Sequence, residues 1–101
     1  MNVLFVCNQN QNRSKTAAKI FQDRFKTRSA GLYNEVPVTK NDISWADTII
    51  VMEKRQRSEL AKRFPVLYMQ KRILSWDIPD VYHFNQPSLI NILKSKLEGL
   101  F

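Results

Sequence analysis

The chain has few of the residues that build fibrous, disulfide-bonded or metal-rich proteins. Its 101 residues include 2 glycines, 4 prolines, 1 cysteine and 1 histidine. The scarcity of glycine and proline excludes collagen-like and low-complexity chains. A single cysteine excludes an internal disulfide framework. Because the chain has only one cysteine and one histidine, we expect neither a metal site nor a cofactor. A lone thiol without an export signal favours a reducing, cytoplasmic setting.

Long apolar runs are also missing. No stretch approaches the roughly 20 apolar residues that a membrane-spanning helix needs, so we expect no membrane partner. The apolar start, residues 1–7, is short and lacks a basic region and a cleavage site, which predicts a strand rather than a signal peptide. A chain of this length with 44% hydrophobic residues can bury one core, and we predict a single domain over residues 1–101.

The charge of the chain is strongly positive. Lysine and arginine number 16 against 9 aspartates and glutamates, a formal net charge of +7. Such a charge attracts phosphorylated substrates or nucleic acid, or it is simply a soluble basic surface. The interleaved aromatic and basic stripe of RNA-binding sheets is absent. We therefore expect a phosphorylated substrate as the partner, with nucleic acid as an alternative.

Two periodicities alternate along the chain. Apolar, β-branched segments predict strands over residues 2–6, 27–30, 47–52 and 73–76. Helical spacing of apolar residues predicts four helices: from Ser14 to Phe25, from a Thr39–Asp42 capping box to Trp45, over 54–64 with Pro65 as the stop, and from Pro87 to Leu100. The alternation predicts an α/β domain with a small four-stranded parallel sheet flanked by helices.

In a parallel α/β sheet the functional crevice lies beyond the carboxyl ends of the strands. This rule selects the loop after Val6, the segment after Met52 and the loop after Trp76. The loop after Val6 contains five consecutive amide side chains: Asn8, Gln9, Asn10, Gln11 and Asn12. Backbone N–H groups of a tight loop and of a helix N-terminus converge on an anion, and Arg13 adds a bidentate fork for phosphate oxygens.

Cys7 precedes these amides and Ser14 follows Arg13. A thiolate under a bound phosphoryl group is an in-line nucleophile, and the Ser14 hydroxyl either donates to the sulfur or caps the helix. The alternative interpretation of Cys7 is a small buried hydrophobe at a strand end. That interpretation leaves the five amides beside it unexplained, so we favour the nucleophile.

The loop after Trp76 carries two acids, Asp77 and Asp80. Phosphoryl transfer from an ester oxygen needs a proton donor on the leaving group, and a carboxylic acid opposite the thiolate supplies it. Both aspartates are also common turn residues, which is the alternative interpretation. The sequence does not choose between Asp77 and Asp80.

Together these segments resemble the low-molecular-weight protein tyrosine phosphatases. Their signature is Cys-x5-Arg-Ser directly after the first strand, with an acid loop late in the chain. Residues 29–31 resemble the end of the family's second strand, and residues 45–53 resemble its third strand. The resemblance implies a flavodoxin-like three-layer sandwich and a shortened branch of the family.

The resemblance implies a role for each matching residue of the first loop. Cys7 matches the nucleophile, Arg13 the phosphate-binding arginine, and Ser14 the hydroxyl that helps the thiolate leave. Asn10 matches a loop asparagine with an unusual backbone conformation. The other amides, Asn8, Gln9, Gln11 and Asn12, complete the phosphate-binding loop.

The resemblance extends to the acid loop and the pocket wall. Asp80 matches the general acid, with Asp77 as the second candidate, and Tyr82 lines the cleft. Tyr33 stands where the family places a pocket aromatic. His83, the lone histidine, is expected to be exposed rather than catalytic.

The chain also departs from the family pattern. It is shorter than most members, and the missing length falls between Gly31 and Asp47, where the family builds walls of the substrate pocket. Gln9 replaces a common glycine, Asn12 a frequent second cysteine, and Val81 the proline after the acid. The nucleophile and the arginine are retained, so these departures concern the choice of substrate rather than the chemistry.

The sequence therefore predicts a metal-independent, cysteine-dependent phosphomonoesterase, similar to protein tyrosine phosphatases, that forms a phosphocysteine. One alternative is a phosphocysteine carrier domain, which needs neither Arg13 nor Asp80 and typically has small loop residues. Another is a catalytically weak basic module that binds phosphate or nucleic acid. Arsenate reduction on the same scaffold needs further cysteines, which this chain lacks.

Overall fold

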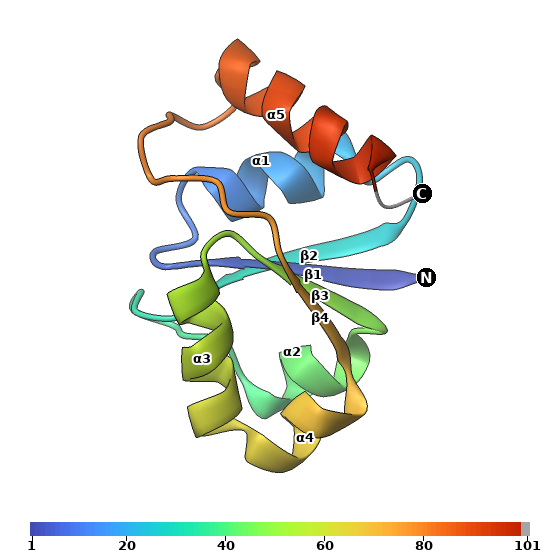
Figure 1. Cartoon of the computed structure of the whole chain (residues 1–101), viewed down its shortest axis with the longest axis vertical. Helices are drawn as coiled ribbons and strands as arrows, with labels where there is room; N and C mark the ends of the chain where they lie inside the picture. Colours follow the sequence, from blue (N-terminus) through green and yellow to red (C-terminus); the bar gives the residue numbers. More distant parts are fainter. Residues whose placement is uncertain (100–101) are drawn as a thin grey trace.

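The computed structural model describes residues 1–99 as a three-layer α/β domain (Figure 1). The strands are β1 (Asn2–Cys7), β2 (Lys26–Gly31), β3 (Thr48–Val51) and β4 (Arg72–Ser75). The helices are α1 (Arg13–Ile20), α2 (Lys40–Trp45), α3 (Lys54–Arg63), α4 (Pro65–Gln70) and α5 (Pro87–Glu98). In the described chain, no helix is long and apolar enough to cross a bilayer.

The four strands form one parallel sheet in the order β2-β1-β3-β4, which confirms the predicted architecture. In Figure 1, α1 and α5 lie on one side of the sheet and α2, α3 and α4 on the other. β1 is central, with Val6 opposite Ala30 of β2 and Val51 of β3. Its carboxyl end, at Cys7, therefore lies in the middle of the edge that the crevice rule selects.

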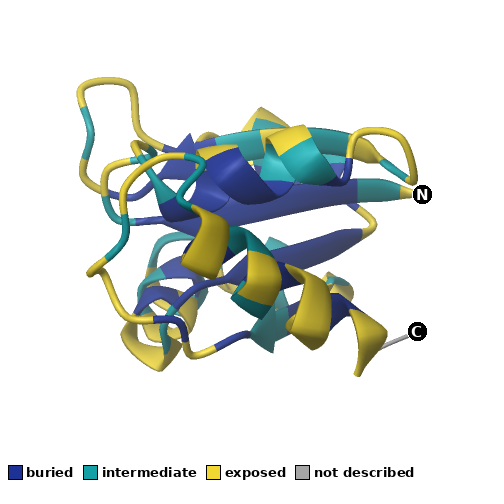
Figure 2. Cartoon of the chain, turned by 90° about the horizontal axis from the view of Figure 1, so that it is seen from above, coloured by how far each residue is buried: buried dark blue, intermediate teal, exposed yellow. Residues whose placement is uncertain are grey.

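Alternate residues of β1 and β3 supply two separate cores. Val3, Phe5 and Cys7 face the α1/α5 layer, whereas Leu4 and Val6 face the layer of α2 and α3. Because both faces of the central strands are covered, these segments are continuously apolar, as strands buried on two sides must be. Figure 2 shows the central strands as a buried band, with exposed residues along the outer side of α5.

The start of the acid loop (residues 77–86) is anchored to this framework. Trp76 is buried against Phe5 and Phe21, with ring centroids 5.8 and 6.3 Å away. Its backbone N–H donates to the Val51 carbonyl at 3.0 Å, and Ile78 N–H donates to the Met52 carbonyl at 2.8 Å. The chain therefore leaves β4 along a fixed path toward the end of β1.

Several predicted boundaries differ from the structure. The first helix ends at Ile20 rather than at Phe25, which instead packs beside the same core from the turn that follows. Pro65 does stop α3, but it also starts α4, so the described residues contain five helices rather than four. Proline suits a first helical turn because its missing N–H has no partner there anyway.

Two other predictions at helix ends have different outcomes. The capping box at α2 is confirmed, since Asp42 N–H donates to Thr39 Oγ1 at 3.2 Å and Thr39 N–H donates to Asp42 Oδ2 at 2.9 Å. The last helix begins at Pro87 as predicted, and its Leu89, Leu93 and Leu97 are buried. Leu100, the predicted end of that helix, lies outside the described residues.

Candidate active site

Cys7 is the last residue of β1, and its buried sulfur meets the first turn of α1. Its Sγ lies 2.9 Å from Ser14 Oγ, and the Ser14 hydroxyl also donates to Asn10 Oδ1 at 2.8 Å. A hydroxyl has one proton, so while that proton points to Asn10 the Ser14 oxygen can accept the proton of the Cys7 thiol. When the sulfur is a thiolate, that proton can turn from Asn10 to the sulfur and stabilise its charge.

Asn10 has a left-handed backbone conformation in the loop of residues 8–12. Its φ angle is 52°, in the left-handed region that asparagine tolerates better than most residues. The Asn10 side chain donates from Nδ2 to the Ser29 carbonyl at 3.5 Å, while its Oδ1 accepts from Ser14. The unusual backbone that the resemblance implied at this residue is therefore present and is held from both sides.

Arg13 is the most buried charged residue of the site, with 1% of its surface exposed. Its Nη1 donates to Glu53 Oε1 at 2.6 Å and to the Ile78 carbonyl at 2.7 Å. Its Nε lies 3.7 Å from Asp80 Oδ1. Because Nη1 is occupied, the Nε and Nη2 edge of the guanidinium is the part available to an anion.

Glu53 follows β3 and orients Arg13. Burial alone raises the pKa of Glu53, but the hydrogen bond and positive charge of Arg13, together with Arg55, outweigh it and lower the pKa below its ordinary value. Arg55 Nε lies 2.9 Å from the second carboxylate oxygen, Glu53 Oε2. Glu53 is therefore ionised at neutral pH and holds the guanidinium in place.

Cys7 and Arg13 open into a pocket of about 60 Å³, small enough to suit a single tetrahedral anion. Its walls consist of polar side chains beside the thiol, and the lining residues are Cys7, Gln9, Gln11, Asn12, Arg13 and Asp80. Asp80 stands at the rim with 54% of its side chain exposed. The pocket therefore combines a thiol, a cation and a carboxyl group.

The two candidate acids are separated by the fold. Asp80 lines the small pocket, whereas Asp77 has a positive φ of 55° and accepts a hydrogen bond from Ser75 Oγ at 2.8 Å. Asp77 lines a different groove, of about 380 Å³, together with Glu53 and Lys54. Of the two aspartates, Asp80 is the one that lines the pocket beside Cys7 and Arg13.

Neither predicted aromatic lines the pocket. Tyr82 is partly buried and packs against the core of the α1/α5 layer. Tyr33 is 55% exposed, and its ring stacks under the Arg63 guanidinium, 5.1 Å from the ring centre. Tyr33 reaches the site through its backbone, because its N–H donates to the Asn8 carbonyl at 2.8 Å.

The sequence predicted Gly31 only as the end of a strand, and it indicated no role for Gln56. A Cβ atom on Gly31 would lie 2.9 Å from the Asn8 carbonyl oxygen, so glycine lets the end of β2 pass close to the loop. Gln56 is buried inside the first turn of α3 and bonds to Asn8. The signal for Gln56 was its spacing, three residues after Glu53 at a helix start, which is typical of a capping box.

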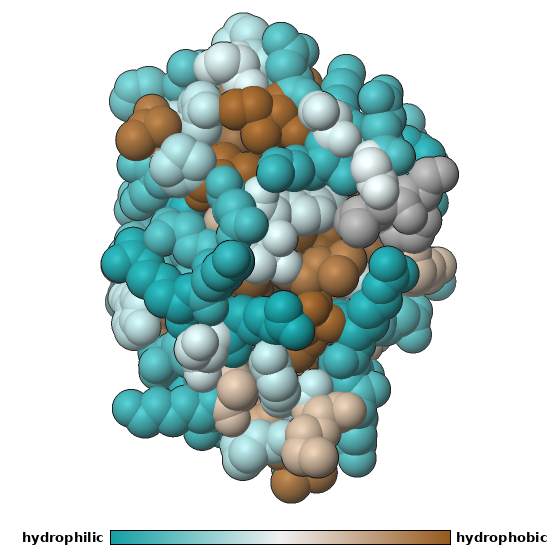
Figure 3. Space-filling model, in the orientation of Figure 1, coloured by the Kyte–Doolittle hydropathy of each residue, from teal (hydrophilic) through white to brown (hydrophobic). Residues whose placement is uncertain are grey.

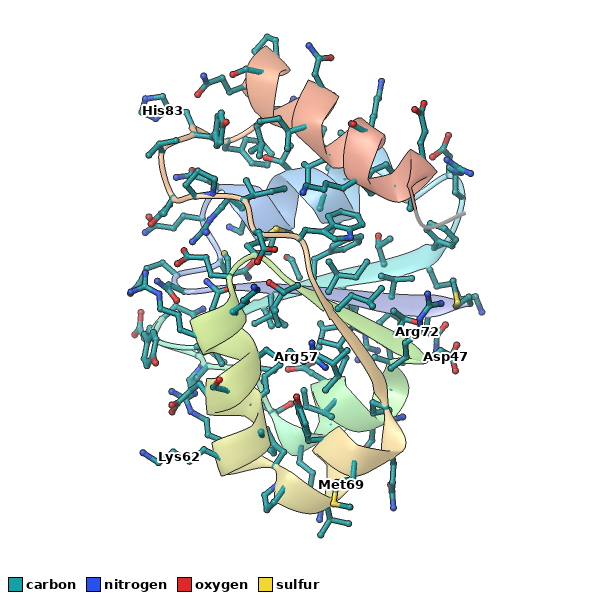
Figure 4. The ribbon with its side chains drawn as sticks, in the orientation of Figure 1. Asp47, Arg57, Lys62, Met69, Arg72 and His83 are labelled. Atoms are coloured by element: carbon teal, nitrogen blue, oxygen red, sulfur yellow. The ribbon has the colours of Figure 1, made fainter. Side chains whose placement is uncertain are left out.

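The remaining cations do not gather at the pocket. Arg13 is the sole lysine or arginine among the pocket-lining residues, Arg57 donates to Tyr68 Oη, and Lys71 donates to two carbonyls near α2. Lys62 points away from α3 and His83 lies at the outer side of its loop (Figure 4). Figure 3 shows hydrophilic residues spread over most of the visible face.

The part of the chain that the structure describes also lacks any group of three or more histidine, cysteine, aspartate or glutamate residues suited to a metal ion. The site is therefore assembled from one sulfur, one buried guanidinium, one rim carboxyl group and the backbone of a tight loop.

Solved structures identify the architecture. The low-molecular-weight protein tyrosine phosphatase from T. tengcongensis aligns with a TM-score of 0.78 and 18% identity, over 100% of this chain and 99% of that one. Vibrio vulnificus Wzb in complex with benzylphosphonate aligns with a TM-score of 0.80 and 19% identity, over 98% and 95% of the two chains. The chain has the fold of the low-molecular-weight phosphatases.

The arginine phosphatase YwlE shares this phosphatase fold. A mutant with a phosphorylated active-site serine aligns with a TM-score of 0.70 and 19% identity, over 99% of this chain and 88% of that one. No family model matches the sequence, and no curated protein matches it. The likeness is therefore one of fold, and it confirms the architecture that the sequence resemblance implied.

Proposed function

We propose that the protein is a cysteine-dependent phosphomonoesterase that works through a phosphocysteine intermediate. The observation that carries this proposal is the small pocket in which Cys7, Arg13 and Asp80 meet. These are a nucleophile, an anion-binding group and a proton donor, the three functions that hydrolysis of a phosphate ester needs. The phosphatase names of the structural neighbours support the same class of reaction.

In the first step, the Cys7 thiolate attacks phosphorus and the bond from phosphorus to the ester oxygen breaks. The N–H groups of the 8–12 loop and the Nε and Nη2 edge of Arg13 bind the phosphoryl oxygens as their charge shifts. Asp80, in its protonated form, gives its proton to the departing oxygen. The products are an alcohol or phenol and a phosphocysteine.

In the second step, water attacks the phosphocysteine and Asp80 takes a proton from that water. The phosphorus–sulfur bond breaks, and the Ser14 hydroxyl donates to the returning thiolate across the 2.9 Å contact. The mechanism uses no metal and requires Cys7 as a free thiol, which suits a reducing compartment such as the cytoplasm.

The presence of Arg13 and Asp80 in one pocket favours a hydrolase over a carrier domain, because a carrier must protect its phosphocysteine from water. It also favours an enzyme over a passive binding module, since binding alone needs no rim acid. The substrate is a phosphomonoester, and a phosphoprotein is one candidate.

The direct test of this function is the variant Cys7→Ser with an aryl phosphate as substrate. We expect hydrolysis to vanish while circular dichroism shows an unchanged fold, because a serine hydroxyl is a far weaker nucleophile than a thiolate. Ser58→Ala, an exposed position on α3, is the control and should retain full turnover. Turnover by Cys7→Ser at the wild-type rate refutes the mechanism.

A further inference from the structure

Gln56 is a buried polar side chain beside the site, and the proposed mechanism leaves it without a role. It lies in the first turn of α3, and 1% of its surface is exposed. A buried carboxamide needs partners for both its oxygen and its nitrogen, since each unpaired polar group costs stability. The partners of Gln56 are therefore informative about what it does.

The two ends of the Gln56 carboxamide bind two different segments. Its Oε1 accepts from the backbone N–H groups of Met52 and Glu53 at 2.8 and 2.9 Å, where β3 passes into α3. Its Nε2 donates to Asn8 Oδ1 at 3.1 Å. One side chain thus joins the end of β3 to the residue directly after the nucleophile.

Both of these segments are linked to residues that line the pocket. Glu53, whose N–H is held by Gln56, places its carboxylate on Arg13 at 2.6 Å. Asn8 is held on the opposite side by Tyr33, which donates its N–H to the Asn8 carbonyl at 2.8 Å. The Asn8 backbone is thereby fixed from the β2 side and its side chain from the α3 side.

We propose that Gln56 is a positioning residue that fixes the 8–12 loop relative to Arg13 through Asn8, so that the loop is shaped for phosphate before phosphate arrives. The inference rests on the proposed function, since it assigns a task within the same pocket. A carboxamide suits this task because it offers an acceptor to the two backbone donors and a donor to Asn8. An apolar side chain of the same length leaves all three groups without this partner.

The test compares Gln56→Met and Asn8→Ala, singly and together. Isothermal titration with inorganic phosphate gives affinity, and aryl phosphate hydrolysis gives kcat and KM. We expect each single variant to weaken phosphate binding about tenfold, equivalent to about 1.4 kcal/mol. The double variant should be no weaker than the worse single variant, because both changes remove the same bond.

The control is Leu60→Ala, another fully buried position on α3, whose side chain belongs to the core of the α2/α3 layer. It should lower the melting temperature while leaving phosphate affinity unchanged. If Gln56→Met fails to fold, Asn8→Ala removes the same hydrogen bond from the loop side, where the core is undisturbed. Unchanged phosphate affinity in Asn8→Ala overturns the proposal.

Two readouts separate this inference from the proposed function. Phosphate binding that depends on Gln56, in a protein without hydrolytic activity, supports the positioning role and refutes the phosphatase. Hydrolysis that is as fast in Gln56→Met as in the wild type refutes the positioning role and leaves the phosphatase standing. If the losses of phosphate affinity in the two single variants add up in the double variant, the two residues act independently. That result also refutes the positioning role.

Discussion

The ion pair between Glu53 and Arg13 offers a quantitative test of how the site is held together. The change Glu53→Gln keeps the shape of the side chain but removes its negative charge. The Arg13 guanidinium, which is 1% exposed, then has no carboxylate at this position. A hydrogen bond to a charged group contributes about 1.5–3 kcal/mol. Because Glu53 is 22% exposed, solvent screens part of this energy, and we expect a loss of about 2 kcal/mol. For a domain of this size that lowers Tm by about 10 °C.

The matched control for this variant is Glu59→Gln on α3, the helix that begins directly after Glu53. Glu59 is 24% exposed, nearly as much as Glu53, but its partner Arg63 is itself 27% exposed. A pair of this kind contributes only about 0.3–0.5 kcal/mol, so the control should hardly change Tm. Thermal unfolding of both variants, with hydrolysis measured in parallel, makes the comparison. Equal shifts in Tm would refute the special role of the buried guanidinium, as would full activity in Glu53→Gln.

The same pair predicts a dependence of stability on pH. The folded-state pKa of Glu53 lies below its ordinary value of 4.5, so the ionised form stabilises the fold. This contribution is complete above the unfolded-state pKa and disappears as the pH falls through the lower folded-state pKa. Wild-type Tm should therefore fall more steeply below about pH 4.5 than the Tm of Glu53→Gln. Parallel curves would contradict the assignment.

Two further predictions concern the acid loop and the end of β2. Asp80→Asn should lower kcat on an alkyl phosphate by about 10²–10⁴-fold, the usual contribution of a general acid, whereas Asp77→Asn should have little effect; the reverse order would make Asp77 the acid. Gly31→Ala should destabilise the fold by about 1–3 kcal/mol and weaken phosphate binding, because the added methyl group meets the Asn8 carbonyl oxygen. Unchanged phosphate affinity in Gly31→Ala would show that the close approach does not shape the loop.

The strands and the first loop were predictable because local chemistry decides them. β1 is buried on both faces, so its continuous apolar run has one physical explanation. Cys7 and Arg13 face one pocket because a tight loop ending in a helix brings them together, and that geometry is set by adjacent residues. The sequence also predicted Asp80 near Cys7 and Arg13, because the carboxyl ends of parallel strands lie at one edge of the sheet.

Features that depend on contacts distant in sequence were missed or misplaced. α4 was missed because Pro65 both stops one helix and starts the next, and its role depends on what packs there. Gln56 bonds to Asn8 across 48 positions of sequence, which no local pattern records. Tyr33 was predicted as a pocket wall, but its ring is stacked under Arg63, a partner 30 positions later that periodicity cannot reveal.

The phosphocysteine is the central claim, and rapid quenching followed by mass spectrometry tests it most directly. During turnover of an aryl phosphate, a phosphoryl group should appear on the peptide that contains Cys7. It should accumulate further in Asp80→Asn, because the second step then lacks its base. Sustained hydrolysis with no phosphoryl group on Cys7, or with one on another residue, would contradict the account.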